Sequence, residues 1–518
     1  MRIRTASDRA LLVETADLDE AMSLHRAWTG MTGVVELVPG ARTVLVHFDP
    51  LVISAAGLAA LLAATVPDAV PPRATGELTI AVRYDGADLA EVAGLLGVSA
   101  EEVVRRHAAA HWTVAFTGFA PGFGYLVGDD PLFDVPRRPS PRTRVPAGSV
   151  GLAGRFTGAY PRESPGGWQL IGSTDAPLWD VRREPPALLA PGTRVRFVAV
   201  PPSESATSPR RTTSAAAAPA ATSARRLEVL RPALQLLVQD RGRPGLAHLG
   251  VSPSGAADRT ALRDANRAVG NDRRAAVLEC IPPVALRMHG TGVVAVTGAV
   301  AEILVTGDAG HSRTISHGIP FAVADGDVIE LGPLIRGLRC VIGVRGGIRT
   351  PVELGSRATD TLSGLGPAPL AAGDVVEIGE DAAQAVKPHP LPRALPPSGD
   401  LVVLDVTLGP RDDWFTAAAL RTLTDQEWAV TPRSDRVGIR LLGESALERC
   451  VAGELPSEGA VTGALQVPPD GQPVLFLSDH PLTGGYPVIA AVVDACLDEA
   501  AQLPPGTRVR FRAVDPAG

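Results

Sequence analysis

Lysine is almost missing from this chain of 518 residues: of its 49 basic residues, only Lys387 is a lysine. Schiff-base chemistry needs a lysine amine, and so does the attachment of a biotin carrier group. Lys387 stands in Val386-Lys387-Pro388-His389-Pro390, which is typical of a linker rather than of the hairpin that presents a carrier lysine. We therefore expect any such carrier to be on another chain.

Cysteines are few, and long apolar runs are absent. The four cysteines are far apart and form no C-x-x-C pair, so neither a zinc site nor a disulfide framework is expected, and no metal site is predicted. Met1-Arg2-Ile3-Arg4 does not lead into an apolar segment, so no signal peptide is expected. No apolar run reaches the length that crosses a membrane. These absences predict a cytoplasmic protein.

Aromatic residues make up only 4% of the chain, and the net charge of −7 argues against nucleic acid as a main partner. Glycine and proline are abundant instead, with 54 and 47 residues. Both interrupt long helices and favour turns. The composition therefore predicts many short strands, and the length predicts two to four domains.

Several common catalytic motifs are also missing. The sequence has no G-x-x-x-x-G-K-[ST] phosphate loop, no G-x-G-x-x-G after a strand and no H-E-x-x-H. It lacks a G-x-S-x-G elbow as well, so nothing supports serine-hydrolase chemistry. Any catalysis is therefore expected from acid, base and donor groups on loops.

The stretch from Thr117 to Thr174 is dense in glycine and proline. It holds three segments: GFAPGFGYL at 118–126, RRPSPRTRVPAGSV at 137–150 and ESPGGWQLIG at 163–172. Glycines let a ligand approach the backbone, and prolines reduce loop entropy. The segments predict either ordinary turns between barrel strands or a rigid pocket whose N–H groups and arginines hold an anion or a carbonyl.

These segments resemble the allophanate hydrolase subunit 1 family, also known as the B subunits of 5-oxoprolinase, over residues 1–200. One departure is Gly124, where that family often has proline; it loosens the loop but removes no functional group. The family usually has a histidine at the position of His107, which makes His107 a further candidate. The substrate-binding residues that the resemblance implies are Phe119, Pro121, Gly122, Tyr125, Arg142, Ser164, Gly166, Gly167 and Trp168.

The second half resembles the allophanate hydrolase subunit 2 family, also known as the C subunits of 5-oxoprolinase, over residues 226–515. The matching segments are VQDRGRPG at 238–245, HLGVSPSGAAD at 248–258, SDRVG at 434–438, GALQVP at 463–468 and SDHPLTGGYP at 478–487. Their candidate substrate-binding residues are Arg241, His248, Ser252, Asp258, Arg436, Gln466, Gly484 and Gly485. The candidate acid–base groups are Asp240, Asp479 and His480.

Each candidate has a structural alternative. For the arginines and aspartates, it is an ion pair that fixes a loop. For Asp258, which stands beside the predicted start of a helix at Arg259, capping and catalysis both stay open. Asp479 and His480 are adjacent and precede Gly484 and Gly485, which favours a site there.

An internal repeat predicts one barrel design used more than once. PGTRVRF at 191–197 recurs at 505–511, and PGGWQLI at 165–171 parallels TGGYPVI at 483–489. The resemblance implies a mainly β protein with cyclophilin-like β-barrels, one in the first half and two in the second. We expect a small α+β N-terminal unit at 1–78, a barrel at 79–200, a flexible linker at 201–225, and barrels at 226–383 and 400–518.

The resemblance implies an ATP-dependent 5-oxoprolinase, which opens a cyclic amide to give glutamate, with ATP and magnesium as cofactors. Phosphorylation of the amide oxygen would make a better electrophile for water, and arginines and loop N–H groups would stabilise the charge. The B and C components would be fused in this chain. The A component of 5-oxoprolinase, of the LamB/YcsF type, would be a separate partner, and the oligomeric state stays open.

Two other interpretations stay open. The same paired domains occur in urea carboxylase, where they transfer a carboxyl group from biotin; this chain would need the biotin-carboxylase and carrier parts from other chains. The family also resembles a sporulation-kinase inhibitor and its antagonist, so a non-enzymatic kinase regulator is a further alternative. Fusion of both halves suits a shared active site better than antagonism.

Overall fold

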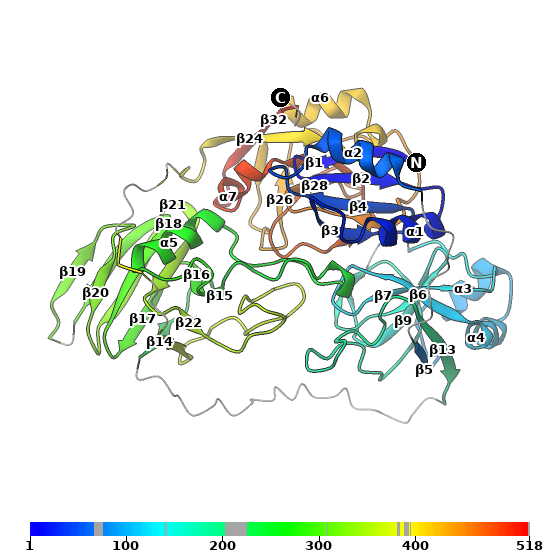
Figure 1. Ribbon diagram of the computed structural model, residues 1–518, viewed down its shortest axis with the longest axis horizontal. Helices are drawn as coiled ribbons and strands as arrows, with labels where there is room; N and C mark the ends of the chain where they lie inside the picture. The colour runs from blue at the N-terminus through cyan, green and yellow to red at the C-terminus, as the bar shows by residue number, and fades with distance from the viewer. Residues whose placement is uncertain are drawn as a thin grey trace.

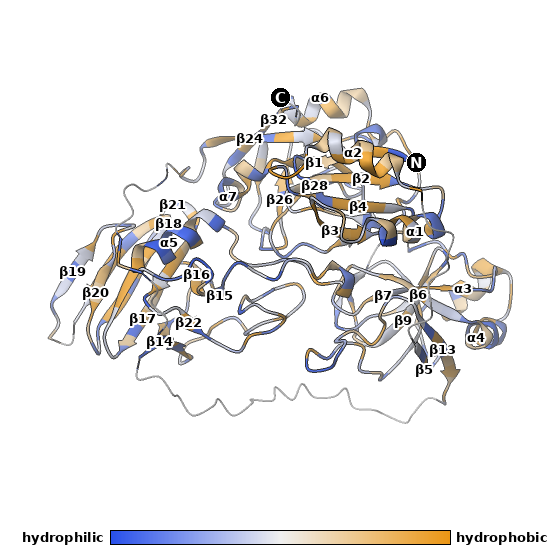
Figure 2. Cartoon of the chain, viewed as in Figure 1, coloured by the Kyte–Doolittle hydropathy of each residue, from blue (hydrophilic) through white to orange (hydrophobic). Residues whose placement is uncertain are grey.

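The computed structural model describes residues 1–66, 76–138, 140, 142–201, 225–307, 309–380, 384–387, 393 and 395–515. The predicted linker therefore lies outside the described residues from 202 to 224. The described chain is mainly β and forms four units, each built around its own sheet (Figure 1). Hydrophobic residues gather on the strands of these sheets (Figure 2).

The N-terminal unit is a four-stranded antiparallel sheet with the strand order β1-β2-β4-β3 and two helices. Trp28, Leu24 and Leu58 lie buried between the helices and the sheet. Strands β3 and β4 form an antiparallel hairpin. The elements are β1 (Arg2–Ser7), β2 (Ala10–Glu14), α1 (Leu18–Trp28), β3 (Val34–Pro39), β4 (Thr43–Phe48) and α2 (Ala55–Ala64).

The second unit is a curled seven-stranded sheet in the order β12-β9-β10-β7-β6-β13-β5. A single bridge between Arg83 and Ser173 joins its two ends. The elements are β5 (Gly76–Val82), α3 (Leu89–Leu96), α4 (Ala100–Ala109), β6 (Trp112–Thr117), β7 (Gly124–Gly128), β8 (Arg142–Val145), β9 (Ser149–Ala153), β10 (Phe156–Ala159), β11 (Ser164–Gly166), β12 (Gln169–Ser173) and β13 (Thr193–Ala199).

The third unit is a ten-stranded sheet whose longest strands, β18 and β21, pair with each other. Helix α5 packs on this pair. The elements are β14 (Arg226–Arg231), β15 (Gln235–Gln239), η1 (Ala247–Leu249), α5 (Arg259–Val269), β16 (Val277–Ile281), β17 (Val284–His289), β18 (Gly292–Thr306), β19 (Ser312–Ile315), β20 (Phe321–Val323), β21 (Val328–Val344), β22 (Ile348–Arg349) and β23 (Val375–Ile378).

The fourth unit is a closed barrel in the order β24-β31-β28-β29-β26-β25-β32. The elements are β24 (Leu401–Leu408), η2 (Asp412–Trp414), α6 (Ala417–Asp425), β25 (Trp428–Val430), β26 (Gly438–Leu442), β27 (Glu458–Gly459), β28 (Ala464–Gln466), β29 (Val474–Phe476), β30 (Thr483–Gly484), β31 (Val488–Val492), η3 (Asp494–Cys496), α7 (Leu497–Ala500) and β32 (Arg508–Ala513).

Three of the helix ends are set by caps. The side chains of Ser54 and Ser99 accept hydrogen bonds from the N–H groups of Gly57 and Glu102, both at 3.2 Å. Helix α5 ends at Gly270, whose φ of 74° is the left-handed conformation that glycine adopts freely. No described helix is both long enough and apolar enough to span a membrane.

The internal repeat corresponds to a repeated structure. Its two PGTRVRF copies lead into β13 and β32, and each of these strands pairs in parallel with the first strand of its sheet, β5 or β24. Trp112 and Trp428 open the strands that follow α4 and α6. Each indole Nε1 donates at 3.0 Å to the carbonyl five residues earlier, at His107 and Leu423. One design therefore underlies the second and fourth units.

The N-terminal unit packs on the fourth unit, more than 400 positions away in the sequence (Figure 1). Leu12 and Leu45 share a buried cluster with Phe476 and Val488. Burying each large apolar side chain contributes roughly 1.5–3 kcal/mol, so this contact joins the beginning and the end of the chain firmly.

Buried ion pairs reinforce the same interface. Arg411, nearly buried, donates from Nε to Glu458 at 3.0 Å and from Nη1 to Glu14 of the N-terminal unit. Arg4 donates from Nε to the same Glu14 oxygen at 2.9 Å. Since both arginines share Glu14, separating the units would leave charged groups without their partners.

Candidate functional site

A cleft of about 510 Å³ opens where the N-terminal, third and fourth units meet. Each unit supplies one wall, so the site exists only in the assembled chain. From the sequence candidates it brings together Asp240, Arg241 and His480. The polar residues that line it are Ser7, Asp8, Arg9, Glu36, His47, Asp240, Arg241, Ser254, Arg259, Arg263, Arg273, Thr462, Ser478, His480 and Asp494.

His480 is buried in the wall from the fourth unit and is fixed at both ring nitrogens. Its Nδ1 lies 2.9 Å from the carbonyl oxygen of Pro481, and its Nε2 lies 3.1 Å from Oγ1 of Thr462. A carbonyl only accepts, so Nδ1 carries the proton and Nε2 accepts from the Thr462 hydroxyl. The ring also stacks on Phe476, and burial lowers the pKa of His480.

Arginines supply the positive charge of the cleft. Arg259 and Arg9 pair with Asp494, at 2.8 and 3.1 Å. Arg241 and Arg273 are exposed, and among the described residues neither has a hydrogen bond or an ion pair. These two guanidinium groups are therefore available to a carboxylate or a phosphate.

The N-terminal unit contributes polar groups of a different kind. Burial lowers the pKa of His47 to about 4, so this imidazole is neutral at pH 7. Burial also raises the pKa of Glu36, whose Oε1 accepts from the N–H of Ala247 at 2.9 Å. The pKa of Asp8 is raised by burial and by the neighbouring Asp494 carboxylate. Perturbed groups of this kind concentrate at functional sites.

Backbone strain occurs at the same place. Ser254 lines the cleft with a φ of 50°, which is uncommon for a residue other than glycine. Its hydroxyl donates to Oδ1 of Asp479 at 2.7 Å. Strained residues of this type cluster at ligand sites, because the surroundings must hold them in place.

Asp240 borders the cleft, but its carboxylate binds its own loop and the loop at Ser356 and Arg357. Oδ1 accepts from the Ser356 hydroxyl at 2.6 Å and from the N–H of Gly242 at 2.8 Å, while Oδ2 accepts from the N–H of Arg357 at 2.7 Å. All these contacts fix the loop that carries Arg241. Asp240 therefore positions the loop of Arg241.

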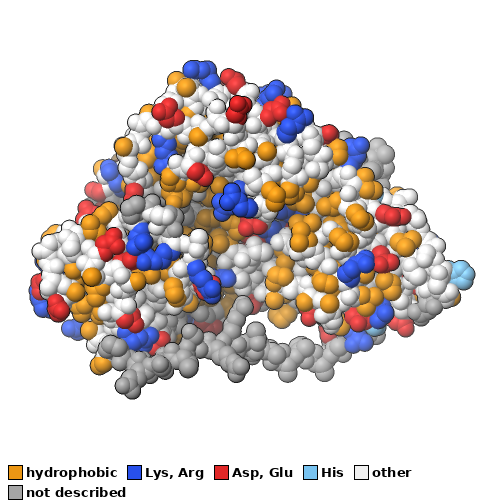
Figure 3. All heavy atoms as spheres, turned by 180° about the vertical axis from the view of Figure 1, so that it is seen from behind, with side chains coloured by type: hydrophobic (Ala, Val, Ile, Leu, Met, Phe, Trp, Pro, Cys, Tyr) orange, Lys and Arg blue, Asp and Glu red, His pale blue; other side chains and the backbone are white. Residues whose placement is uncertain are grey.

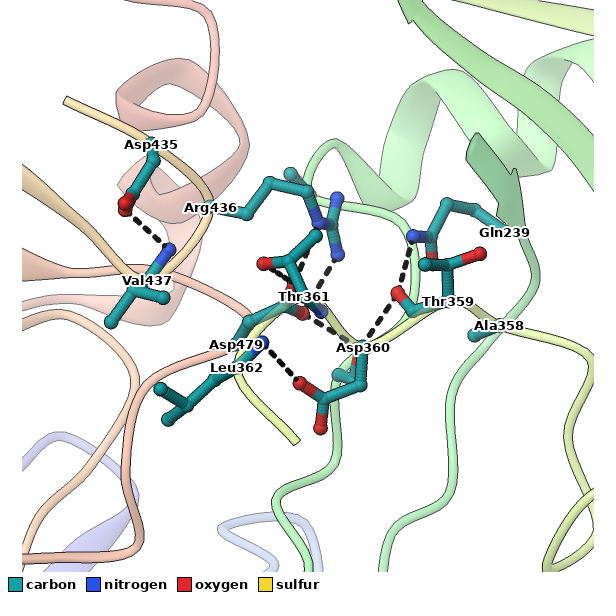
Figure 4. A network of polar contacts seen from close by, with 12 residues as sticks. Gln239, Ala358, Thr359, Asp360, Thr361, Leu362, Asp435, Arg436, Val437 and Asp479 are labelled. Atoms are coloured by element: carbon teal, nitrogen blue, oxygen red, sulfur yellow. Dashed lines mark hydrogen bonds and ion pairs between the residues drawn. The ribbon is translucent and has the colours of Figure 1, made fainter. Parts of the chain in front are cut away.

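Asp479 and Arg436 form a buried brace behind the cleft (Figure 4). Arg436 donates to both carboxylate oxygens of Asp479, from Nε at 2.9 Å and from Nη2 at 3.0 Å, and also to Glu279. Asp479 further accepts from the N–H and the hydroxyl of Thr361, at 2.9 and 2.7 Å. Arg436 holds the pKa of Asp479 below its usual range. No ligand reaches this pair without opening the junction of the third and fourth units.

Asp258 and Ser252 are satisfied in the interior as well. Asp258 caps α5, accepting from the N–H of Ala261 at 2.8 Å, and also accepts from Nε2 of Gln502 at 2.7 Å. Ser252 donates to Asp360 at 3.2 Å. For Asp258 the capping alternative from the sequence is present in the structure.

The first glycine-rich loop lies against η1 of the third unit. The N–H of Gly122, with a φ of 76°, donates to the carbonyl of Leu249 at 3.0 Å, and the buried Pro121 precedes it. Phe119 has a φ of 61° and an edge-on contact with Phe123 at 5.5 Å. This loop therefore serves as a contact between the two halves.

An aromatic cluster supports the motif residues of the second unit. Trp168 is buried and packs edge-on against Phe123 at 5.2 Å. The Tyr125 hydroxyl lies 3.3 Å from Oγ1 of Thr483 in the fourth unit. Ser164 and Gly166 form strand β11, and the carbonyl of Gly167 accepts from the N–H of Arg138 at 2.8 Å.

The glycine loop of the fourth unit closes on the second unit. Gly484 pairs with Glu458 in the β27–β30 ladder. Gly485 faces the guanidinium of Arg137, so closely that a Cβ there would lie 1.9 Å from Nη1. Gln466 is buried, and its Nε2 donates to the carbonyl of Tyr486 at 3.3 Å. The motif loops of the two halves thus meet face to face.

Arg142 is bound to a carboxylate of its own unit. It donates from Nη1 and Nη2 to the two oxygens of the buried Asp88, at 2.9 and 2.7 Å. Asp88 also accepts from Arg138 at 2.8 Å and from the N–H of Leu170 at 2.7 Å. Arg142 therefore fixes its loop through an ion pair with Asp88.

We predict that Arg142→Ala lowers the free energy of unfolding by about 1–3 kcal/mol, because it removes a charge-assisted pair and leaves Asp88 with fewer donors. Arg142→Lys should restore part of it, since lysine keeps the charge without the planar fork. Urea denaturation and ligand titration of the same variants measure both quantities. A variant of wild-type stability that binds ligand weakly would identify Arg142 as a clamp instead.

Neither His107 nor His248 lines the cleft: His107 lies in the core of the second unit, and His248 lines another cavity. His107 is fully buried between the hydroxyls of Tyr84, 2.8 Å from Nδ1, and Thr157, 2.9 Å from Nε2. Burial lowers its pKa to about 3. The side chain of His248 lines a separate cavity of about 1170 Å³ beside α1.

His107 should make the protein acid-sensitive. Its folded pKa of about 3 lies below the unfolded value of 6.5, so its contribution to stability is full above pH 6.5 and falls as the pH drops towards 3. The slope is roughly 1.4 kcal/mol per pH unit. His107→Gln should flatten the stability curve in this window, measured by urea denaturation at stepped pH. Equal slopes for both proteins would contradict the prediction.

Most of the polar lining residues were not predicted from the sequence, among them Asp8, Glu36, His47, Arg273 and Thr462. The first three belong to the N-terminal unit, which carries none of the glycine-rich motifs. Thr462 does stand next to the GALQVP segment, but its hydroxyl matters only because His480 lies beside it. No local pattern signals such a juxtaposition.

Comparisons with known proteins cover both halves. The family model for the carboxyltransferase domain, subdomain C and D, matches residues 1–189, and that for subdomain A and B matches residues 249–513. The crystal structure of TTHA0988 superposes with a TM-score of 0.81 and 34% identity, covering 97% of this chain and 100% of that one.

Curated relatives divide along the same line. The 5-oxoprolinase C subunit of Escherichia coli (strain K12) is 32% identical over 55% of this chain and 90% of its own length. The 5-oxoprolinase B subunit of Escherichia coli O157:H7 is 50% identical over 23% of this chain and 57% of its own length. Urea amidolyase of Saccharomyces cerevisiae is 31% identical over 55% of this chain, but over only 16% of its own length. The chain therefore belongs to the carboxyltransferase-domain family, with counterparts of the B and C subunits of 5-oxoprolinase joined in one polypeptide.

Proposed function

We propose that this chain is the B and C part of an ATP-dependent 5-oxoprolinase, an amidohydrolase that opens the cyclic amide of 5-oxoproline to glutamate together with a separate A component. The carrying observation is the cleft, in which the free Arg241 and the fixed neutral His480 converge on a space built from both halves. The similarity to proteins named as the B and C subunits of 5-oxoprolinase supports the same assignment.

The cleft suits a small anionic amide. The free guanidinium groups of Arg241 and Arg273 would hold the substrate carboxylate. The apolar side chains of Val461, Leu482 and Val492 would exclude water around the ring and strengthen the charge interactions. His480 is ready to accept a proton, because it is neutral and its tautomer is fixed.

ATP would supply a phosphoryl group that activates the amide oxygen. Arg241 and Arg273 fit the phosphates of ATP as well as a carboxylate, since both kinds of group present two oxygens to one guanidinium. Among the described residues, no group of three His, Cys, Asp or Glu side chains is placed to hold a metal. The magnesium ion that we expect with ATP would be held mainly by phosphate oxygens.

The decisive experiment measures glutamate formation and ATP consumption by the purified chain with 5-oxoproline, with and without a LamB/YcsF-type A component. We expect little turnover by the chain alone, and glutamate with matched ATP hydrolysis when the A component is added. Full activity without a partner, or activity without ATP, would contradict the proposal.

A carboxyltransferase function is the second candidate, because the second half is also similar to urea amidolyase. In that case the substrate would be urea, and the carboxyl group would come from a biotin carrier on another chain. Transfer of labelled carboxyl from carboxybiotin to urea, in the absence of the A component, would favour this alternative over the first.

A further inference from the structure

Thr462 presents the reactive end of a hydrogen-bonded chain in the cleft. Thr462 lines the cleft and is partly exposed, and its hydroxyl lies 3.1 Å from Nε2 of His480. The far nitrogen of His480 donates to the carbonyl of Pro481 at 2.9 Å. A hydroxyl, a base within hydrogen-bond reach and a third group that orients the base are the three parts of an activated nucleophile.

The local structure holds these parts rigidly. Thr462 lies between β27 and β28 in a loop closed on both sides: the N–H of Ala460 donates to Leu482 at 2.9 Å, and that of Gly463 donates to Phe476 at 2.9 Å. His480 stacks on Phe476, with ring centroids 5.6 Å apart and planes 10° apart. Neither side chain needs to move for a proton to pass from Oγ1 to Nε2.

Thr462 and His480 differ in how far they are exposed to the cleft, and this difference identifies the nucleophile and the base. His480 is 2% exposed and uses both of its nitrogens inside the protein, so a substrate in the cleft meets the hydroxyl first. Nε2 becomes available to a leaving nitrogen or to water only after Oγ1 has given up its proton. Ser478 lines the same cleft, but no described base lies within hydrogen-bond distance of its hydroxyl. Thr462 is thus distinguished from the other hydroxyl on this wall by its contact with a base.

We propose that Thr462 is a catalytic nucleophile activated by His480. Its Oγ1 attacks the carbonyl carbon of an amide in the cleft while its proton passes to Nε2. The carbon–nitrogen bond then breaks, and the proton moves from Nε2 to the leaving nitrogen, which leaves an ester on Thr462. Water, deprotonated by His480, hydrolyses this ester, releases the carboxylate and restores the threonine. The choice of an amide rests on the proposed function; the activated hydroxyl does not.

The test uses the whole chain and p-nitrophenyl acetate, an activated ester that needs neither ATP nor a partner protein. We expect release of p-nitrophenol and one acetyl group on the peptide that contains Thr462, located by mass spectrometry. Thr462→Val keeps the side-chain shape and should slow acetylation by about a hundredfold or more. Thr462→Ser should keep it, and His480→Gln should lose it. All variants should melt within a degree or two of wild type, checked by thermal denaturation.

Two matched controls complete the design. Thr424→Val removes a hydroxyl that donates to the carbonyl of Arg421 on the exposed face of α6, and it should react like wild type. Ser478→Ala removes the other hydroxyl of the wall and should also be acetylated at Thr462. Acetylation that is unchanged in Thr462→Val, or found on Ser478, would overturn the proposal. Acetylation of Thr462 in a chain that shows no turnover of 5-oxoproline even with ATP and the A component present would leave the nucleophile in place and overturn only the proposed substrate.

Discussion

Arg436→Met is expected to lower the free energy of unfolding by about 3–5 kcal/mol, the largest effect of any single substitution considered for this protein. The guanidinium is completely buried and holds the carboxylates of Asp479 and Glu279 from two different units. Without it, two buried negative charges face each other in a medium that solvates them poorly. Urea denaturation followed by tryptophan fluorescence would measure the loss.

A compensated variant tests the reason for this loss. If unpaired charge is the cause, replacing Arg436, Asp479 and Glu279 together by Met, Asn and Gln should recover much of the stability, since this removes the buried charges and leaves amide oxygens to accept from Thr361 and Ser254. A loss in Arg436→Met below about 1 kcal/mol, together with weakened ligand binding, would show that the arginine holds a ligand instead.

Arg241→Gln is expected to reduce kcat/KM for 5-oxoproline by roughly 30- to 1000-fold, equivalent to about 2–4 kcal/mol, because it removes a charge-assisted contact with the substrate. Its melting temperature should not change, since the side chain is exposed and has no partner among the described residues. Arg241→Lys should fail to restore activity, because lysine lacks the planar fork. Steady-state kinetics with the LamB/YcsF-type partner present would measure the change.

The matched control is Arg155→Gln. Arg155 is another exposed arginine, on the turn between β9 and β10 of the second unit, and it does not line the cleft. It should leave kcat/KM unchanged. Equal losses in the two variants would mean that the overall charge of the protein, and not the cleft, governs the reaction. Calorimetric titration with 5-oxoproline supplies a readout that does not depend on turnover.

The surface around the assembled units mixes acidic and basic side chains with scattered hydrophobic ones, as the rear view shows (Figure 3). On that face, no unit of the described chain gathers charge of one sign over its whole extent.

The sequence by itself determined the local structure and the family. Serine caps at Ser54 and Ser99, the glycine stop at Gly270 and the repeated PGTRVRF segments all depend on residues close together in the chain, and each is present in the structure. The motif segments likewise placed the chain among relatives of the B and C subunits of 5-oxoprolinase. Signals of this kind are readable because a turn or a cap depends on neighbours in the chain.

The tertiary structure alone decided which charged residues face a ligand. An arginine on a loop has the same local signature whether its partner is a substrate or a distant carboxylate. Arg436 meets Asp479 and Glu279, Arg142 meets Asp88, and Arg241 meets no described partner. These outcomes depend on how residues far apart in the sequence pack together, because burial makes an unpaired charge costly and so selects the partners.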